Sequence, residues 1–213
     1  MAEREWASVF VAILLMFIVA GLPSIAGGQL LFMTQVFVSS FVIVGGAVLM
    51  RKAFAHSLDI GVEHRIWSFY RFGVKPGWHF PKALPFGVIV PLFFAFLGLL
   101  ARLPIMIFTF LTYETKALKH RAAKRFGFYS YTEITDWHNA LVGASAIVFA
   151  LIISLIGYFL NFEVLAKMAA YYAVWNMVPF SDLDGTQIFF GNKVLWIVLA
   201  ITTVIFALYA SVI

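Results

Sequence analysis

Residues 139–160 read NALVGASAIVFALIISLIGYFL, a stretch without a charged side chain that is long enough to cross a lipid bilayer as a helix. A hydrocarbon core of about 30 Å requires roughly 20 predominantly apolar residues in a helix. Three further stretches, 8–27, 31–50 and 193–213, meet the same requirement, and 164–181 is a shorter fifth candidate. The sequence therefore predicts an all-α, polytopic membrane protein.

The overall composition agrees with this class of protein. Of the 213 residues 63% are apolar and 12% are charged, whereas a soluble domain is about 45–50% apolar and about 25% charged. Cys is absent, which excludes disulfides, thiolate–metal sites and cysteine nucleophiles. We interpret residues 1–213 as a single integral membrane domain in contact with the lipid bilayer.

The basic residues are concentrated in two segments. Residues 51–85 carry six basic and two acidic side chains, a net charge of +4, and residues 102–137 carry six and three, a net charge of +3. Because basic loops usually stay in the cytoplasm, we expect an inner-membrane protein with a cytoplasmic amino terminus. We interpret the excess charge as a topology signal and not as a nucleic-acid-binding surface.

The stretch 84–111 lies between these segments and is long enough to cross the membrane, yet it contains three prolines and Arg102. A single crossing would put the two basic segments on opposite sides. We therefore favour a re-entrant segment, shielded from lipid by protein, over a sixth crossing. The prediction is five to six transmembrane segments with a small membrane-embedded β-strand or re-entrant region.

Two polar segments complete this outline. Residues 63–72 partly alternate polar and apolar side chains, which predicts a short strand. Residues 112–137 are mixed in charge, and we predict a cytoplasmic connector that includes a short basic helix.

The segment most suggestive of chemistry is NMVPFSDLDG at 176–185. A carboxylate such as Asp184, beside a glycine and on a helix broken by Pro179, is suited to binding a cation. Ionisable groups at the edge of a membrane span require a partner, a cavity or water. An ordinary exit turn explains the same residues, because Asp-Gly and Pro are common in turns.

This segment resembles the second signature of the site-2 proteases, intramembrane zinc metalloproteases of peptidase family M50, most closely their archaeal and bacterial members. The pattern Asn-x-x-Pro-x-x-x-Leu-Asp-Gly is strong at 176–193, and a weaker likeness extends over about 45–205, with a predicted core at 31–193. The resemblance implies that Asp184 is a zinc ligand. It also implies that Asn176 and Pro179 lie beside the bound substrate.

The first signature of that family, His-Glu-x-x-His, is degenerate here. Its spacing puts both His side chains on one helix face as zinc ligands, with Glu as the general base. The matching stretch is KAFAH at 52–56. Lys52 stands at the first His, Ala53 stands at the catalytic Glu, and only the second His, His56, remains.

This degeneracy has a chemical consequence. A protonated lysine has no lone pair for a metal, and a methyl group cannot accept a proton. The two remaining ligands, His56 and Asp184, are fewer than the three protein ligands usual in catalytic zinc sites. The sequence therefore predicts a catalytically impaired homologue that binds a transmembrane client or partner. The expected cofactor is zinc if the chain is active, and none is required otherwise.

Two other functions stay open from the sequence. The chain could be an active intramembrane zinc metalloendopeptidase with displaced ligands that cleaves transmembrane segments. It could also be a small transporter or a structural subunit that reuses the fold.

The role of Lys52 also has two interpretations. Its ammonium group could replace the metal by pairing with Asp184, because a lone buried carboxylate is very costly in a low dielectric. Alternatively Lys52 joins Arg51 as a cytoplasmic anchor whose charge reaches the interface.

A displaced metal site is a further alternative. His56, Asp59 and Glu63 are spaced i, i+3 and i+7, which would put them on one face of a continuing helix. Together with His64 and Asp184 they could hold a metal, although a solvated helix end explains the same residues.

Overall fold

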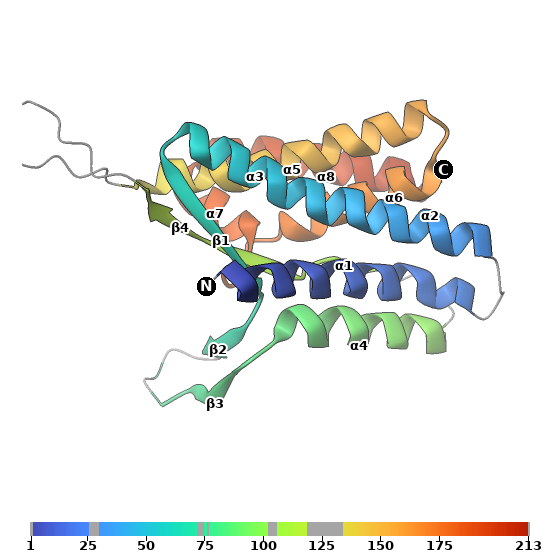
Figure 1. The fold of residues 1–213 in the computed structure, drawn as a ribbon, viewed down its shortest axis with the longest axis horizontal. Helices are drawn as coiled ribbons and strands as arrows, with labels where there is room; N and C mark the ends of the chain where they lie inside the picture. The colour runs from blue at the N-terminus through green and yellow to red at the C-terminus, as the bar shows by residue number, and fades with distance from the viewer. Residues whose placement is uncertain are drawn as a thin grey trace, which may run out of the picture.

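The computed structural model describes residues 2–25, 30–71, 75, 77–101, 106–118 and 134–212. Its helices run side by side, with the amino terminus, the strands β1 and β4 and the short helix α7 at one end and the carboxyl terminus at the other (Figure 1). We call these the sheet end and the far end.

Four helices of the described part are long and apolar enough to cross a membrane. They are α1 (Ala2–Ile25), the continuous helix α2–η1–α3 (Leu30–Ser40, Phe41–Gly45 and Gly46–Ser57), α5 (Asp136–Phe159) and α8 (Lys193–Val212). The predicted long helices are thus all present.

The prediction of five to six spans exceeds these four. The helices α4 (Phe86–Ala101) and α6 (Glu163–Asn176) have 16 and 14 residues. At a rise of 1.5 Å per residue they are about 24 and 21 Å long, which is shorter than a bilayer core. The apolar stretch 164–181 was expected to continue as helix, but α6 ends at Asn176, three residues before Pro179.

The stretch 84–111 begins and ends at the sheet end. Strand β3 (His79–Leu84) leads into α4, which runs toward the far end, and strand β4 (Leu111–Ala117) lies at the sheet end again (Figure 1). Residues 112–117 were expected in a connector, but they form most of β4. The predicted basic helix of that connector falls largely on 119–133, outside the described residues.

The predicted strand is present, and it belongs to a two-stranded sheet. Strand β1 (Ile60–Ile66) pairs antiparallel with β4, from Ile60 opposite Ala117 to Ile66 opposite Leu111. A second pair joins β2 (Phe69–Arg71) to β3 with an irregular register. The alternation of side chains gives the β1–β4 sheet one buried and one charged face.

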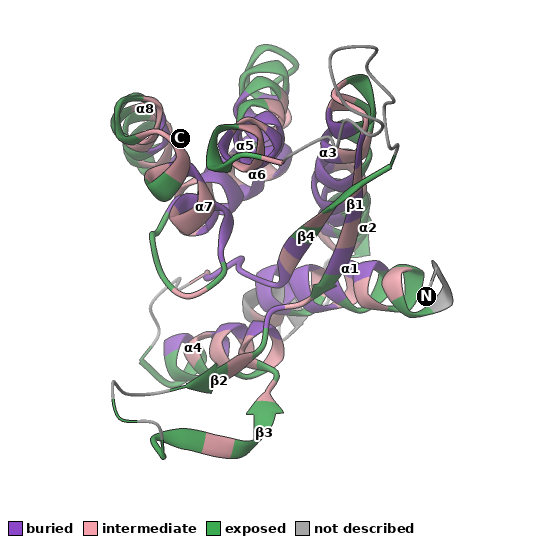
Figure 2. Ribbon diagram, turned by 90° about the vertical axis from the view of Figure 1, so that its left-hand side faces the viewer, coloured by how far each residue is buried: buried purple, intermediate pink, exposed green. Residues whose placement is uncertain are grey.

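Burial differs strongly between the helices. Helix α5 is 61% buried over its most apolar window, whereas α8 is 17% buried. Small residues make the central position of α5 possible: a Cβ built at Gly157 would lie 2.9 Å from Ala166 N of α6. Buried residues follow the inner helices and the sheet, and the outer face of α8 is exposed (Figure 2).

Candidate functional site

A buried ion pair joins two segments that lie far apart in the chain. Arg51 Nη2 of α3 donates a hydrogen bond to Asp184 Oδ2, at the start of α7 (Asp184–Gly191). The two side chains are 2% and 1% exposed. The Arg51 guanidinium carbon also lies 4.5 Å from the centroid of the Tyr113 ring, on β4. Residues of α3, β4 and α7 therefore enclose one pair of opposite charges.

Local backbone structure positions Asp184. Leu183 is extended and precedes the first turn of α7, and its carbonyl accepts hydrogen bonds from Thr186 N at 3.0 Å and Gln187 N at 3.3 Å. A carboxylate in the first turn is favoured by the positive end of the helix dipole. A side chain at Gly185 would overlap the Met177 carbonyl, so that the missing Cβ allows α7 to pack on the end of α6.

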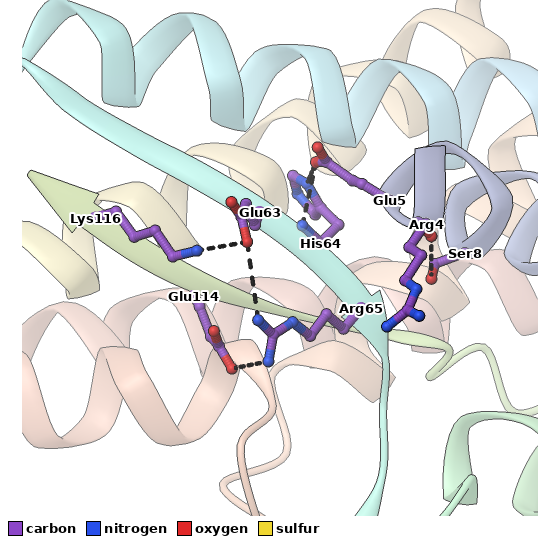
Figure 3. Close-up of polar contacts among 8 residues, drawn as sticks. All are labelled: Arg4, Glu5, Ser8, Glu63, His64, Arg65, Glu114 and Lys116. Atoms are coloured by element: carbon purple, nitrogen blue, oxygen red, sulfur yellow. Dashed lines mark hydrogen bonds and ion pairs between the residues drawn. The ribbon is translucent and has the colours of Figure 1, made fainter. Parts of the chain in front are cut away.

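The neighbouring residue Lys52 has a different partner. Lys52 Nζ lies 2.8 Å from Glu5 Oε1 of α1, and the same oxygen accepts hydrogen bonds from His64 N at 3.1 Å and from His64 Nδ1 at 3.0 Å. Figure 3 shows Glu5 above His64 on β1. Three N–H groups from two elements thus converge on one carboxylate oxygen.

Of the two interpretations of Lys52, the pairing with Asp184 was wrong, because the partner of Lys52 is Glu5. Successive residues of a helix point about 100° apart, so Arg51 and Lys52 cannot both face α7. The inward position is taken by Arg51, whose planar guanidinium is less strongly hydrated than an ammonium and suits a buried carboxylate.

Burial changes the acidity of the groups around this pair. It raises the pKa of Asp184 to about 6, while the Arg51 charge and hydrogen bond oppose that rise. Burial lowers the pKa of His64 to about 3, assisted by the Arg51 charge and opposed by Glu5. Burial also raises the pKa of the Tyr113 hydroxyl. At neutral pH, His64 is therefore uncharged and Asp184 is ionised.

The two predicted metal ligands lie in different surroundings. His56 is exposed in the last turn of α3, whereas Asp184 is buried and bonded to Arg51. Because His56 follows Arg51 by five residues, it points about 140° away from it around the helix. Within the described ranges, no group of three or more His, Cys, Asp or Glu side chains is close enough to hold a metal.

The alternative of a displaced metal site required α3 to continue to Glu63, and the helix does not. The helix ends at Ser57, and Asp59 adopts a positive φ of 59° just before β1 begins. Asp is among the few residues that tolerate this left-handed conformation, which often terminates helices. Glu63 consequently lies on the charged face of the sheet, where its Oε2 is 2.7 Å from Lys116 Nζ (Figure 3).

The predicted substrate-contact residues lie around the segment that links α6 to α7. Asn176 is 2% exposed, and its Nδ2 donates 2.8 Å hydrogen bonds to the carbonyls of Phe108 and Tyr172. It therefore holds the segment around Phe108 that leads into β4. Pro179 is exposed, as is Ala53 on α3.

The charged face of the sheet carries alternating ion pairs. Arg65 Nη1 lies 2.7 Å from Glu114 Oε1 and its Nη2 lies 3.8 Å from Glu63 Oε2 (Figure 3). Glu63 and Glu114 are directly opposite each other across the two strands. The cations beside them offset a like-charge contact that would destabilise the pairing.

Two hollows adjoin these elements. A polar cavity of about 530 Å³ lies between β4 and α7, and its lining includes Glu114, Asn139 and Gln187. An apolar groove of about 640 Å³, here called the α1–α3 groove, is lined by Trp6, Val9, Phe10, Ile13, Phe41, Val42, Gly45, Gly46, Val48, Leu49 and Phe149.

Sequence reasoning missed Arg51 and Glu5 as members of the buried polar network. A signal for Arg51 was present: Ala47, Arg51 and Ala55 repeat every four residues, and all three are buried on one face of α3. The sequence has no comparable signal for Glu5, because its partners belong to other elements.

No protein-family model, curated protein or solved structure matches this chain.

Proposed function

We propose that this chain is a site-2-protease-like intramembrane protein that has lost catalysis and binds a transmembrane client or partner. The observation that carries the proposal is the buried Arg51–Asp184 ion pair. By resemblance, Asp184 stands at a zinc ligand of that family, and the guanidinium supplies the positive charge that a metal would supply.

The geometry supports an alignment of His-Glu-x-x-His with residues 51–55, one residue earlier than the expected match at 52–56. Arg51 and Ala55 are buried on one face of α3, where Arg51 reaches Asp184 and Ala55 packs with residues of β1, β4 and α5. Lys52 is partly exposed and His56 is exposed. In the shifted register Arg51 stands at the first His of His-Glu-x-x-His, Lys52 at the Glu and Ala55 at the second His. None of the three residues can serve as a metal ligand or a general base in its ordinary charge state.

Zinc does not fit this donor set. Asp184 already accepts a hydrogen bond from a permanent cation, and a second cation beside Arg51 would be repelled in a low dielectric. A catalytic zinc site usually has three protein ligands, and Asp184 has no His, Cys, Asp or Glu partner set within the described residues. We therefore derive no hydrolytic step for this site.

The α1–α3 groove is the proposed place for a client's membrane-spanning segment. Phe10 and Phe41 on its rims are both 60% exposed, and a Cβ at Gly45 would meet no atom within 4 Å. Residues 41–45 form one π-helical turn, a feature that is frequent at functional sites. A helix could approach Gly45 closely, as small residues permit in membranes, whereas the Phe149 ring already fills the space beside Gly46.

Restoring the zinc motif in two registers tests the proposed alignment. The triple variant Arg51→His/Lys52→Glu/Ala55→His is expected to bind one zinc ion per chain together with Asp184. The matched variant Lys52→His/Ala53→Glu, which uses native His56, is expected to bind none. Elemental analysis and Co²⁺ absorption of the purified proteins measure both. Zinc in the second variant alone would overturn the shifted register.

The unmodified chain tests the loss of catalysis. We expect no stoichiometric zinc, and no cleavage of client segments that crosslink from a photoreactive residue at Phe41. A photoreactive residue at Phe159, which is 71% exposed at the far end of α5, serves as control. Stoichiometric zinc that is lost in His56→Ala would instead support the active metalloendopeptidase.

A further inference from the structure

The segment between β1 and α4 is basic and carries no acidic side chain. Residues 66–101 contain no Asp or Glu, and their described basic residues are Arg71, Lys75 and Lys82. Strands β2 and β3 pair antiparallel in this segment, and we call its described residues 69–71, 75 and 77–84 the basic hairpin. No acidic side chain of this segment can balance the charges of Lys75 and Lys82, whereas the cations of the β1–β4 sheet lie beside glutamates of the same sheet.

Exposed aromatic rings accompany these cations. Tyr70 is 49% exposed and Trp78 is 47% exposed. Lys75 Nζ lies 5.4 Å from the Trp78 ring centroid, and Tyr70 stacks on His79 with centroids 4.9 Å apart. Amphipathic rings of this kind are enriched where a membrane protein meets the lipid headgroups.

Contacts between aromatic rings fix the place of the hairpin relative to the helices. Phe69 stacks on Phe86 of α4 at 4.8 Å and on Phe180 at 5.7 Å, and Trp67 packs edge-on against both of these rings. The hairpin therefore lies at the sheet end, and α4 leads away from it toward the far end (Figure 1).

We propose that the basic hairpin binds the anionic phospholipid headgroups of the leaflet at the sheet end. The lipid phosphates complement the charges of Lys75 and Lys82, in a segment without acidic residues, and the two exposed rings suit the headgroup region. Each Lys or Arg near an anionic membrane surface strengthens binding about fivefold. This inference is independent of the client-binding function, since it uses none of the residues of the ion pair or of the groove.

The absence of cysteine permits a direct test. Ala83 is exposed on β3, and Ala83→Cys can carry an environment-sensitive fluorophore in the full-length chain. The chain is reconstituted into nanodiscs of phosphatidylcholine alone, or with about one third phosphatidylglycerol, and quenching by headgroup-level nitroxide lipids is measured. We expect phosphatidylglycerol to increase quenching and 1 M salt to reverse the increase.

Charge variants identify the groups responsible. Lys75→Gln and Lys82→Gln are each expected to reduce the contact equilibrium about fivefold, and the double variant about 25-fold. Lys167→Gln, on α6, removes the same charge from a helix outside the hairpin and is expected to leave the contact equilibrium unchanged.

Three results would overturn the proposal. These are equal quenching in both lipid compositions, insensitivity to salt, and equal loss in Lys167→Gln. Protection of the fluorophore by soluble poly-glutamate in detergent, without any effect of lipid charge, would assign the hairpin to an acidic protein partner and would also overturn it. The salt titration needs no charge variant, so a variant that fails to fold does not leave the question open.

Discussion

Arg51 and Asp184 illustrate how one residue can satisfy another that is costly to bury. A lone carboxylate in the core would be neutralised or would destabilise the fold, whereas a hydrogen-bonded guanidinium compensates its charge. The pair is nonetheless incompletely satisfied, because Arg51 Nε and Asp184 Oδ1 have no hydrogen-bond partner in the described structure. Such a pair is expected to contribute to the choice of one fold more than to the free energy of unfolding.

Removing one partner of this pair should be more harmful than removing both. We expect Arg51→Met or Asp184→Leu alone to destabilise the protein by about 3–5 kcal/mol, because each leaves an unpaired buried charge. The double variant should be more stable than either single variant. Thermal unfolding in detergent measures the three. The control Lys52→Gln, which breaks a partly exposed pair, should lower stability by about 1 kcal/mol or less. If the stability losses of the two single variants at 51 and 184 add up in the double variant, the pairing is contradicted.

His64 should make the protein sensitive to mild acid. Its pKa is about 3 in the folded protein and 6.5 ordinarily, so below 6.5 the unfolded chain takes up a proton that the folded chain does not. Stability contributed by neutral His64 is therefore lost as the pH falls, by about 2 kcal/mol between pH 7 and pH 5. Unfolding at both pH values, compared with His64→Gln, measures this term.

The comparison with His64→Gln is necessary because Asp184 acts with the opposite sign. Its raised pKa of about 6 means that the folded protein takes up the proton first, which adds stability as the pH falls through 6. Both proteins contain Asp184, so their difference isolates His64. Equal pH slopes in the two proteins would show that His64 does not titrate as described.

At the scale of elements, side chains from helices close both edges of the β1–β4 sheet. The bonds from Leu118 N to Asp59 O and from Trp67 N to Phe110 O assign the odd-numbered residues of β1 to the ladder with β4. The His64 N–H consequently points away from β4, and it donates to Glu5. On the outer edge of β4, Gln187 Nε2 donates to Tyr113 O at 3.2 Å. Capped edges protect a short sheet from pairing with other chains.

Hydrogen exchange can test the cap on β1. In Glu5→Ala the His64 amide loses its acceptor, and we expect its exchange to accelerate about 10- to 100-fold, as for the loss of a hydrogen bond to a charged group. The Arg65 amide, which faces β4, should exchange at an unchanged rate. Equal acceleration at both amides would indicate that the whole strand opens and that Glu5 is not a local cap.

Two glycines should respond differently to the same substitution. Gly185→Ala brings a methyl group onto the Met177 carbonyl and to 2.8 Å from Val178 O, so we expect α7 to shift and stability to fall by about 1–3 kcal/mol. Gly45→Ala meets nothing within 4 Å and should gain about 0.5–1 kcal/mol from helix propensity. Thermal unfolding of the two variants gives the comparison, and a stable Gly185→Ala protein would contradict the close packing of α7.

At the scale of the whole molecule, the strands that connect the long helices lie at the sheet end. The chain leaves this end through α4, and it lies at this end again in β4. This arrangement agrees with the prediction that the chain re-enters between the two basic segments and does not cross. The polar cavity also opens between elements of this end.

Cysteine accessibility tests this topology in a chain without native cysteine. Ser68→Cys and Leu118→Cys flank the α4 segment at exposed positions, and Leu160→Cys is exposed in the turn between α5 and α6. We expect an impermeant maleimide to label the first two from the cytoplasmic side and the third from the opposite side. Labelling of positions 68 and 118 from opposite sides would mean that α4 crosses the membrane.

The sequence by itself determined the long apolar helices of this protein and the basic segments between them. Long apolar runs without charge can only be accommodated as helices in lipid, and this local property does not depend on neighbours. The same reasoning identified the strand near Glu63 and singled out Asp184 as an ionisable group in need of a partner. It overestimated the number of spans because hydropathy does not reveal where a short helix such as α6 ends.

Only the tertiary structure decided which partner each buried charge has. Arg51 and Lys52 are adjacent basic residues, and their difference depends on which face of α3 turns toward α7. Glu5 and His64 are joined by the approach of α1 to β1 across 59 positions of sequence. These contacts arise from the packing of elements that are distant in the chain, whereas hydropathy and charge patterns report only on each segment's own preference for lipid or water.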